Sequence, residues 1–164
     1  MNDNIRPAKE SDVSRLAEIE IFNYRLNFYP IFRNDSFYFG DLQVADKISE
    51  YLRSPEKLKN TSVYDDGVVK GFVTAENSEV KKLFIEPVLQ GQGVGAKLLD
   101  HAVTEMKCEF LWALEKNIKA IAFYERNGFY RTSERKLEED TDEYLIKLGL
   151  LPTLTQQQRK DQMQ

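Results

Sequence analysis

The sequence of 164 residues contains one cysteine, one histidine and no apolar stretch long enough to cross a membrane. Because Cys108 is alone, an internal disulfide is excluded, and a reducing compartment is expected. With His101 as the single histidine, neither a metal site nor a catalytic triad is expected. The first residues lack the charged and apolar regions of a secretory signal, which favours a cytoplasmic protein.

An excess of positive charge is also missing. The 23 Lys and Arg residues are outnumbered by 27 Asp and Glu, the net charge is −4, and no basic cluster dominates one segment. Nucleic acid is therefore not expected as a partner, whereas mild acidity suits a cationic amine. The length fits one domain, which we expect over residues 1–151, followed by a loose, polar, glutamine-rich tail at 152–164. Composition leaves a homodimer open.

Apolar periodicity and turn residues predict that strands and helices alternate. Asp65-Asp66-Gly67 between two β-rich runs is typical of a hairpin, and Pro30 should break any single helix through the aromatic residues 22–39. Gly128 is a predicted left-handed helix end. We expect strands at residues 5–8, 61–64, 68–75, 80–85, 110–114, 129–132 and 142–148, and helices from Ser11 or Asp12, over 42–52, over 96–103 and from Asn117. These elements predict an α/β (α+β) fold, with a mixed, mostly antiparallel sheet, helices on both faces and a parallel crossover over residues 80–114.

The most informative stretch is a glycine-rich turn between the strand at 80–85 and the helix at 96–103. It reads Gln90-Gly91-Gln92-Gly93-Val94-Gly95. Glycines let the backbone adopt left-handed angles and approach an anion, and the N–H groups of a helix N-terminus attract one. The turn is neither a Walker A motif nor a dinucleotide fingerprint, because the spacing of its glycines differs from both.

The turn instead resembles the acetyl-CoA pyrophosphate loop of the Gcn5-related N-acetyltransferase (GNAT) family. A second stretch at 117–129 resembles that family's later signature, which has Asn, then Ala, then Phe-Tyr, then Gly-Phe. The resemblance is best over residues 79–129. It implies a sheet in which two parallel strands splay apart and hold acetyl-CoA, and an enzyme that moves the acetyl group to a primary amine of a small molecule or peptide. In such an enzyme the amine attacks directly in a ternary complex.

Tyr124 matches the tyrosine that many family members use as general acid, and its phenol can donate a proton to the departing thiolate. The alternative is an aromatic core residue. For the base, the resemblance points to Glu79, at the start of the strand before the loop, acting directly or through water; Glu86 is the alternative and is expected to be exposed. Glu79 as a solvated surface acid, with solvent as the base, is equally open.

The resemblance also gives the expected contacts with acetyl-CoA. They are Leu83, Phe84 and Ile85 from the strand, whose backbone N–H groups would bind the oxyanion; Gln90, Gly91, Gln92, Gly93, Val94, Gly95 and Ala96 from the loop; and Asn117, Ala120, Phe123 and Tyr124 from the later helix. Asn117 should cap that helix as well.

An aromatic stretch lies where the family forms one wall of the acceptor site. Its candidate acceptor contacts are Tyr24, Phe28, Tyr29 and Tyr38, which could hold a cation over their rings. The alternative is that these rings pack helices onto the sheet. Two other functions stay open: a non-catalytic acyl-CoA-binding regulatory module, and a phosphate-binding structural domain without CoA.

Overall fold

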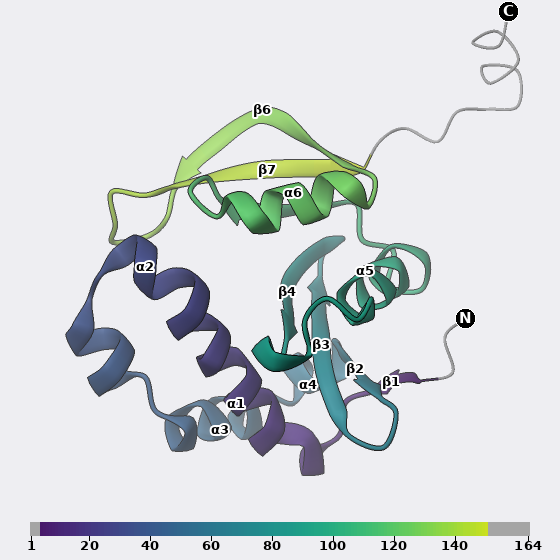
Figure 1. Cartoon of the computed structure of the whole chain (residues 1–164). Coiled ribbons are helices and arrows are strands. Elements are labelled where there is room, and N and C mark those ends of the chain that lie inside the picture. The colour runs from purple at the N-terminus through teal and green to yellow at the C-terminus, as the bar shows by residue number, and fades with distance from the viewer. Residues whose placement is uncertain (1–3, 151–164) are drawn as a thin grey trace, which may run out of the picture.

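The computed structural model describes residues 4–150, which form a mixed sheet with helices on both faces (Figure 1). The described strands are β1 (Ile5–Pro7), β2 (Thr61–Asp65), β3 (Val69–Glu76), β4 (Glu79–Ile85), β5 (Phe110–Leu114), β6 (Phe129–Leu137) and β7 (Tyr144–Leu150). They hydrogen-bond in the order β1-β2-β3-β4-β5-β7-β6. All neighbouring pairs are antiparallel except β4 and β5, which confirms the predicted parallel crossover.

The helices divide between the two faces. They are α1 (Val13–Asn23), α2 (Tyr29–Phe32), α3 (Val44–Arg53), α4 (Pro55–Lys59), α5 (Val94–Thr104) and α6 (Ile118–Arg126). Buried residues of α5 and α6 share one core cluster with β3, β4, β5 and β7, whereas α1 and α3 pack against the opposite face of β2 and β3. Within the described part of the chain no helix is long and apolar enough to cross a membrane.

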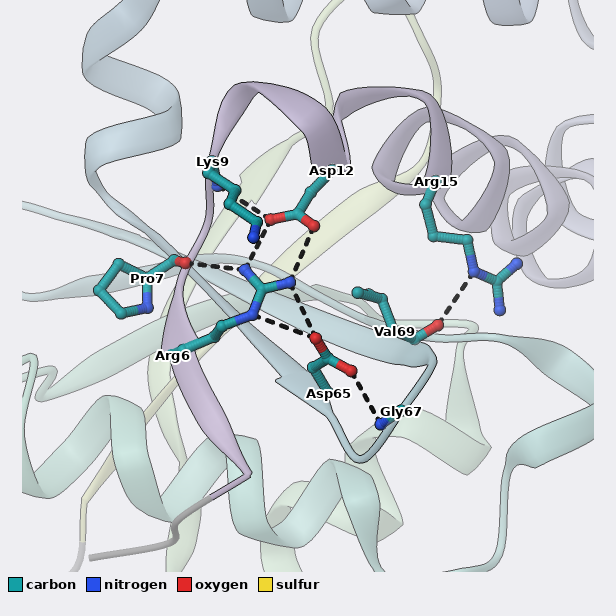
Figure 2. Close-up of polar contacts among 8 residues, drawn as sticks. All are labelled: Arg6, Pro7, Lys9, Asp12, Arg15, Asp65, Gly67 and Val69. Carbon is teal, nitrogen blue, oxygen red and sulfur yellow. Dashed lines mark hydrogen bonds and ion pairs between the residues drawn. The ribbon is translucent and has the colours of Figure 1, made fainter.

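A charged cluster fixes the start of α1 to the hairpin between β2 and β3 (Figure 2). The Arg6 guanidinium donates to Asp12 at 2.8 and 2.9 Å and to Asp65 at 3.0 and 3.2 Å. Asp65 also accepts a bond from the backbone N–H of Gly67, which closes the predicted hairpin turn. The hydrogen bond from Arg6 is the main cause that holds the pKa of Asp12 below its ordinary value, against the effect of burial.

The structure departs from the sequence prediction at several places. Helix α4 was not expected, and β6 continues to Leu137, beyond the predicted end at residue 132. Pro30 stands in the first turn of α2, where a missing N–H costs nothing, and a π-helical turn (Tyr24–Phe28) joins α1 to α2. Asp12 does not cap α1 with its side chain. Residues 152–164 lie outside the described part of the chain, so their expected looseness stays a prediction.

Candidate functional site

Strands β4 and β5 separate after a very short contact. They are paired only at Glu79 with Phe110 and at Val80 with Leu111, while β4 stays paired with β3 as far as Ile85. A register shift in the β3–β4 ladder falls just after these two pairs. The last part of β4 therefore has no strand partner on its β5 side, and the backbone groups that point there are available to a ligand.

The glycine loop lies at the open end of β4 and leads into α5. Gly91 has φ 84° and Gly93 has φ 82°, and both lie in the left-handed region. Gly93 is the N-cap residue of α5, and the first backbone bond of the helix runs from Lys97 N–H to the Gly93 carbonyl at 3.2 Å. Among the described residues, no acceptor is recorded for the N–H groups from Gly91 to Ala96. This row of donors at a helix start can bind an anion.

Helix α6 packs against the start of α5 beside this loop. A Cβ atom built on Gly95 would come within 3.3 Å of the Phe123 ring and 3.6 Å of Ile85 Cγ1. The absence of a side chain at Gly95 thus allows α5, α6 and the end of β4 to approach closely. Phe123 therefore contacts the loop through its ring, while the Val94 side chain is buried and only its backbone can reach a ligand.

Asn117 begins α6 as predicted. Its side-chain oxygen accepts from the Ala120 N–H at 3.3 Å, so the capping role is confirmed. Its side-chain amide donates to no described residue. The neighbouring Ile118 is 72% exposed, so this end of α6 is open to solvent.

Tyr124 combines a packed ring with an unused hydroxyl. The ring lies 5.4 Å from that of Phe123 and 6.2 Å from that of Phe129. Within residues 4–150 the hydroxyl has no hydrogen-bond partner, yet it is not a buried unsatisfied group. Burial raises the pKa of Tyr124 to about 12, which keeps the phenol protonated at neutral pH. Such a group can donate a proton, as a general acid must.

Glu79 lies at the closed end of the two strands rather than at the open end. Its side chain is 16% exposed and forms an ion pair of 2.9 Å with Lys81, on the same strand. The alternative base, Glu86, is not exposed as expected: Arg15 of α1 donates to it at 2.6 Å, and its side chain is only 21% exposed. The expectation for Glu86 was wrong because the sequence does not reveal the arginine that α1 places beside it.

The model of the acetyltransferase (GNAT) domain matches residues 59–131, which include β4, the glycine loop and α6. The matching region of the peptidyl-lysine N-acetyltransferase YjaB of Salmonella typhimurium is 29% identical over 97 residues, which are 59% of this chain and 66% of the relative. The central part of the chain is therefore similar to the acetyltransferase domain of the Gcn5-related N-acetyltransferase family. The alignment thus spans just under two thirds of that relative.

Solved GNAT structures have the same fold over nearly the whole chain. The apo form of YjaB from Escherichia coli superposes with a TM-score of 0.65 at 20% identity, and the match covers 93% of this chain and 100% of that one. The PaiA N-acetyltransferase of Thermoplasma acidophilum, in complex with coenzyme A, superposes with a TM-score of 0.65 at 20% identity. This match covers 90% of this chain and 98% of that one. The GNAT fold, including the separated parallel strands, is therefore confirmed.

A buried ionic cluster on the α1 side of β4 was missed by the sequence reasoning. Glu20 of α1 is completely buried, and its carboxylate accepts from Lys82 of β4 at 2.6 Å and from the hydroxyls of Tyr24 and Tyr51 at 2.8 Å each. Lys47 lies 4.0 Å away. Burial alone would raise the pKa of Glu20, but the two lysines outweigh it and hold the pKa below its ordinary value. A signal existed, because Glu20 falls on the apolar face of α1.

The four predicted acceptor contacts divide into two groups. Tyr24 and Phe28 lie against Phe84 of β4, with ring centroids 5.6 and 6.4 Å from it, so they border the open part of that strand. Tyr29 donates to Asp35 at 2.6 Å and packs on Tyr38, which is buried. Only Tyr24 and Phe28 among the four make a ring contact with β4, although all four belong to one apolar cluster around Ile21 and Leu42.

Proposed function

We propose that this chain is a member of the GNAT family and an acetyl-CoA-dependent N-acetyltransferase. The observation that carries the proposal is the row of unpaired N–H groups from Gly91 to Ala96, at the start of α5 and beside the gap between β4 and β5. A pyrophosphate fits such a row because it accepts several hydrogen bonds and is favoured by the helix dipole. A pantetheine arm that runs from the loop along the gap would pass the unpaired backbone of Leu83 and Phe84.

Acetyl-CoA supplies an acetyl group activated as a thioester. The chain's own residues would then have three tasks. A backbone N–H in the open part of β4 donates to the carbonyl oxygen as it gains negative charge. Tyr124 gives its proton to the sulfur when the C–S bond breaks. The proton lost by the attacking amine goes to Glu79, directly or through water, or to solvent.

For the acceptor we propose the primary amine of a lysine side chain in a peptide, because YjaB, which is similar over 97 residues, is described as acting on peptidyl lysine. The side of β4 that faces α1 suits this amine, since Tyr24 and Phe28 present aromatic rings beside Phe84. A small-molecule amine at the same place would use the same chemistry.

The test is a release assay for free CoA with a thiol-detecting reagent, run with a panel of lysine-containing peptides and small amines. We expect turnover with at least one lysine peptide, and mass spectrometry should show a gain of one acetyl group on the lysine. A panel in which acetyl-CoA binds but no acceptor releases CoA would favour the rival function, a non-catalytic acyl-CoA-binding module.

A further inference from the structure

Asn23, at the end of α1, makes four hydrogen bonds with its side-chain amide. It is 2% exposed, and its amide donates to the carbonyls of Ile19 and Ile85 at 2.8 Å each. Its side-chain oxygen accepts from Gln90 at 3.3 Å and from Asn27 at 3.1 Å. Both donors and both acceptor sites of the amide are therefore occupied.

These four partners belong to different parts of the site. Ile85 is the last residue of β4, and Gln90 is the first residue of the glycine loop. Asn27 lies in the π-helical turn Tyr24–Phe28, which joins α1 to α2 and carries the two rings packed on Phe84. Asn23 thus connects the anion-binding loop on one side with the proposed acceptor wall on the other.

Gln90 makes the connection to the loop. Its side chain turns back into the protein, where Nε2 donates to Asn23 and lies 3.4 Å from the Ile85 carbonyl. The backbone at Gln90 is extended, with φ −68° and ψ 154°, immediately before the left-handed Gly91. A movement of the loop onto a ligand would therefore pull on Asn23 and, through it, on the π-helical turn. Single π-helical turns are often found at functional sites.

We propose that Asn23 and Gln90 are positioning residues that couple occupation of the glycine loop to ordering of the acceptor wall formed by Tyr24–Phe28. The proposal rests on the proposed function, because the loop ligand is taken to be CoA. A ligand bound at the loop restricts Gln90, Gln90 restricts Asn23, and Asn23 holds Asn27 and the turn. By linkage, if CoA strengthens acceptor binding by some factor, an acceptor that orders the turn must strengthen CoA binding by that same factor.

The experiment is amide hydrogen exchange read by mass spectrometry, with and without a saturating concentration of CoA, after calorimetry has established that CoA binds. In the wild type we expect exchange of the amides in residues 24–28 to slow by about fivefold or more, the lower limit of typical coupling. In Gln90→Ala, at a CoA concentration that also saturates the variant, this protection should disappear while protection of the start of α5 persists. Gln90 is partly exposed, so the variant should fold.

Gln92→Ala is the matched control. Gln92 lies in the same loop, is exposed and makes no side-chain hydrogen bond within the described chain, so at a CoA concentration that also saturates this variant the protection of residues 24–28 should persist. Asn23→Asp is the second test: it keeps the size of the side chain but loses both donors, and protection should again be lost. The coupling is overturned if CoA binds the wild type without slowing exchange at 24–28, or if Gln90→Ala keeps the full effect. Failure of CoA to bind at all would instead overturn the proposed function.

Discussion

Removing the positive end of the buried ion pair should reveal how α1 is held on the sheet. Lys82→Met keeps most of the volume of the lysine stem but leaves the Glu20 carboxylate, which is completely buried, without the cation at 2.6 Å. Breaking a buried pair in this way typically costs about 3–5 kcal/mol. The two tyrosine hydroxyls and Lys47 remain, so we expect the lower end, about 3 kcal/mol.

For a domain of this size, about 3 kcal/mol corresponds to a fall in Tm of roughly 6–12 °C. Glu20→Gln should lower the free energy of unfolding less, by about 1–2 kcal/mol. The side chain of Lys82 is 22% exposed, so its ammonium can be hydrated by water, and the glutamine still accepts a hydrogen bond from a tyrosine. The double variant should be more stable than Lys82→Met alone, since no buried carboxylate is left uncompensated. Thermal and urea unfolding, followed by circular dichroism, measure all three differences.

The pH dependence supplies an internal check. In the wild type the folded pKa of Glu20 is lowered, so its contribution to stability is present above its unfolded pKa of 4.5 and is lost as pH falls through the folded value. In Lys82→Met, burial should raise this pKa instead, so the folded variant takes up a proton and recovers stability as pH falls. The difference in unfolding free energy between the wild type and Lys82→Met should therefore become smaller between pH 7 and pH 5. A loss below about 1 kcal/mol at pH 7, or a gap that does not narrow, refutes this reasoning.

Two further predictions concern the chemical step. Tyr124→Phe should bind acetyl-CoA with unchanged affinity and turn over about 100-fold more slowly, because the hydroxyl is needed only as the thiolate leaves. The control is Tyr130→Phe, which changes an exposed tyrosine on β6. Equal turnover rates for the wild type and Tyr124→Phe would leave Tyr124 as a packing residue. If Glu79 takes the proton of the amine, Glu79→Gln should lower kcat/KM most at low pH, where the acceptor is an ammonium, and recover at high pH. Parallel pH–rate profiles would assign the base to solvent.

The sequence reasoning was most accurate where the signal is local. Strand β5 was predicted over its observed length, the Asp65-Asp66-Gly67 hairpin formed, and Asn117 caps α6. Each of these depends on a turn, a cap or a short apolar run within a few residues. The loop conformation followed for the same reason, because only glycine adopts the left-handed angles of Gly91 and Gly93 without strain.

The sequence reasoning failed where the meaning of a residue depends on a distant partner. The sequence analysis assigned no role to Glu20 or Asn23, although their spacing from Leu16 places both on the buried face of α1. Their partners, Lys82 and Gln90, lie more than sixty residues later in the chain. Burying a polar residue costs free energy unless such a partner forms a hydrogen bond or ion pair with it, and the sequence near α1 does not identify that partner.

The central claim is that the glycine loop binds the pyrophosphate of acetyl-CoA, and calorimetric titration of acetyl-CoA into matched glycine variants tests it most directly. Gly93→Val and Gly67→Val both force a β-branched residue into a positive φ, and neither new Cβ meets a protein atom within 4 Å, but only Gly93 lies in the loop. We expect Gly93→Val to weaken binding by about tenfold or more, or roughly 1.4 kcal/mol, and Gly67→Val to bind like the wild type. Wild-type affinity in Gly93→Val, or equal losses in both variants, would contradict the account.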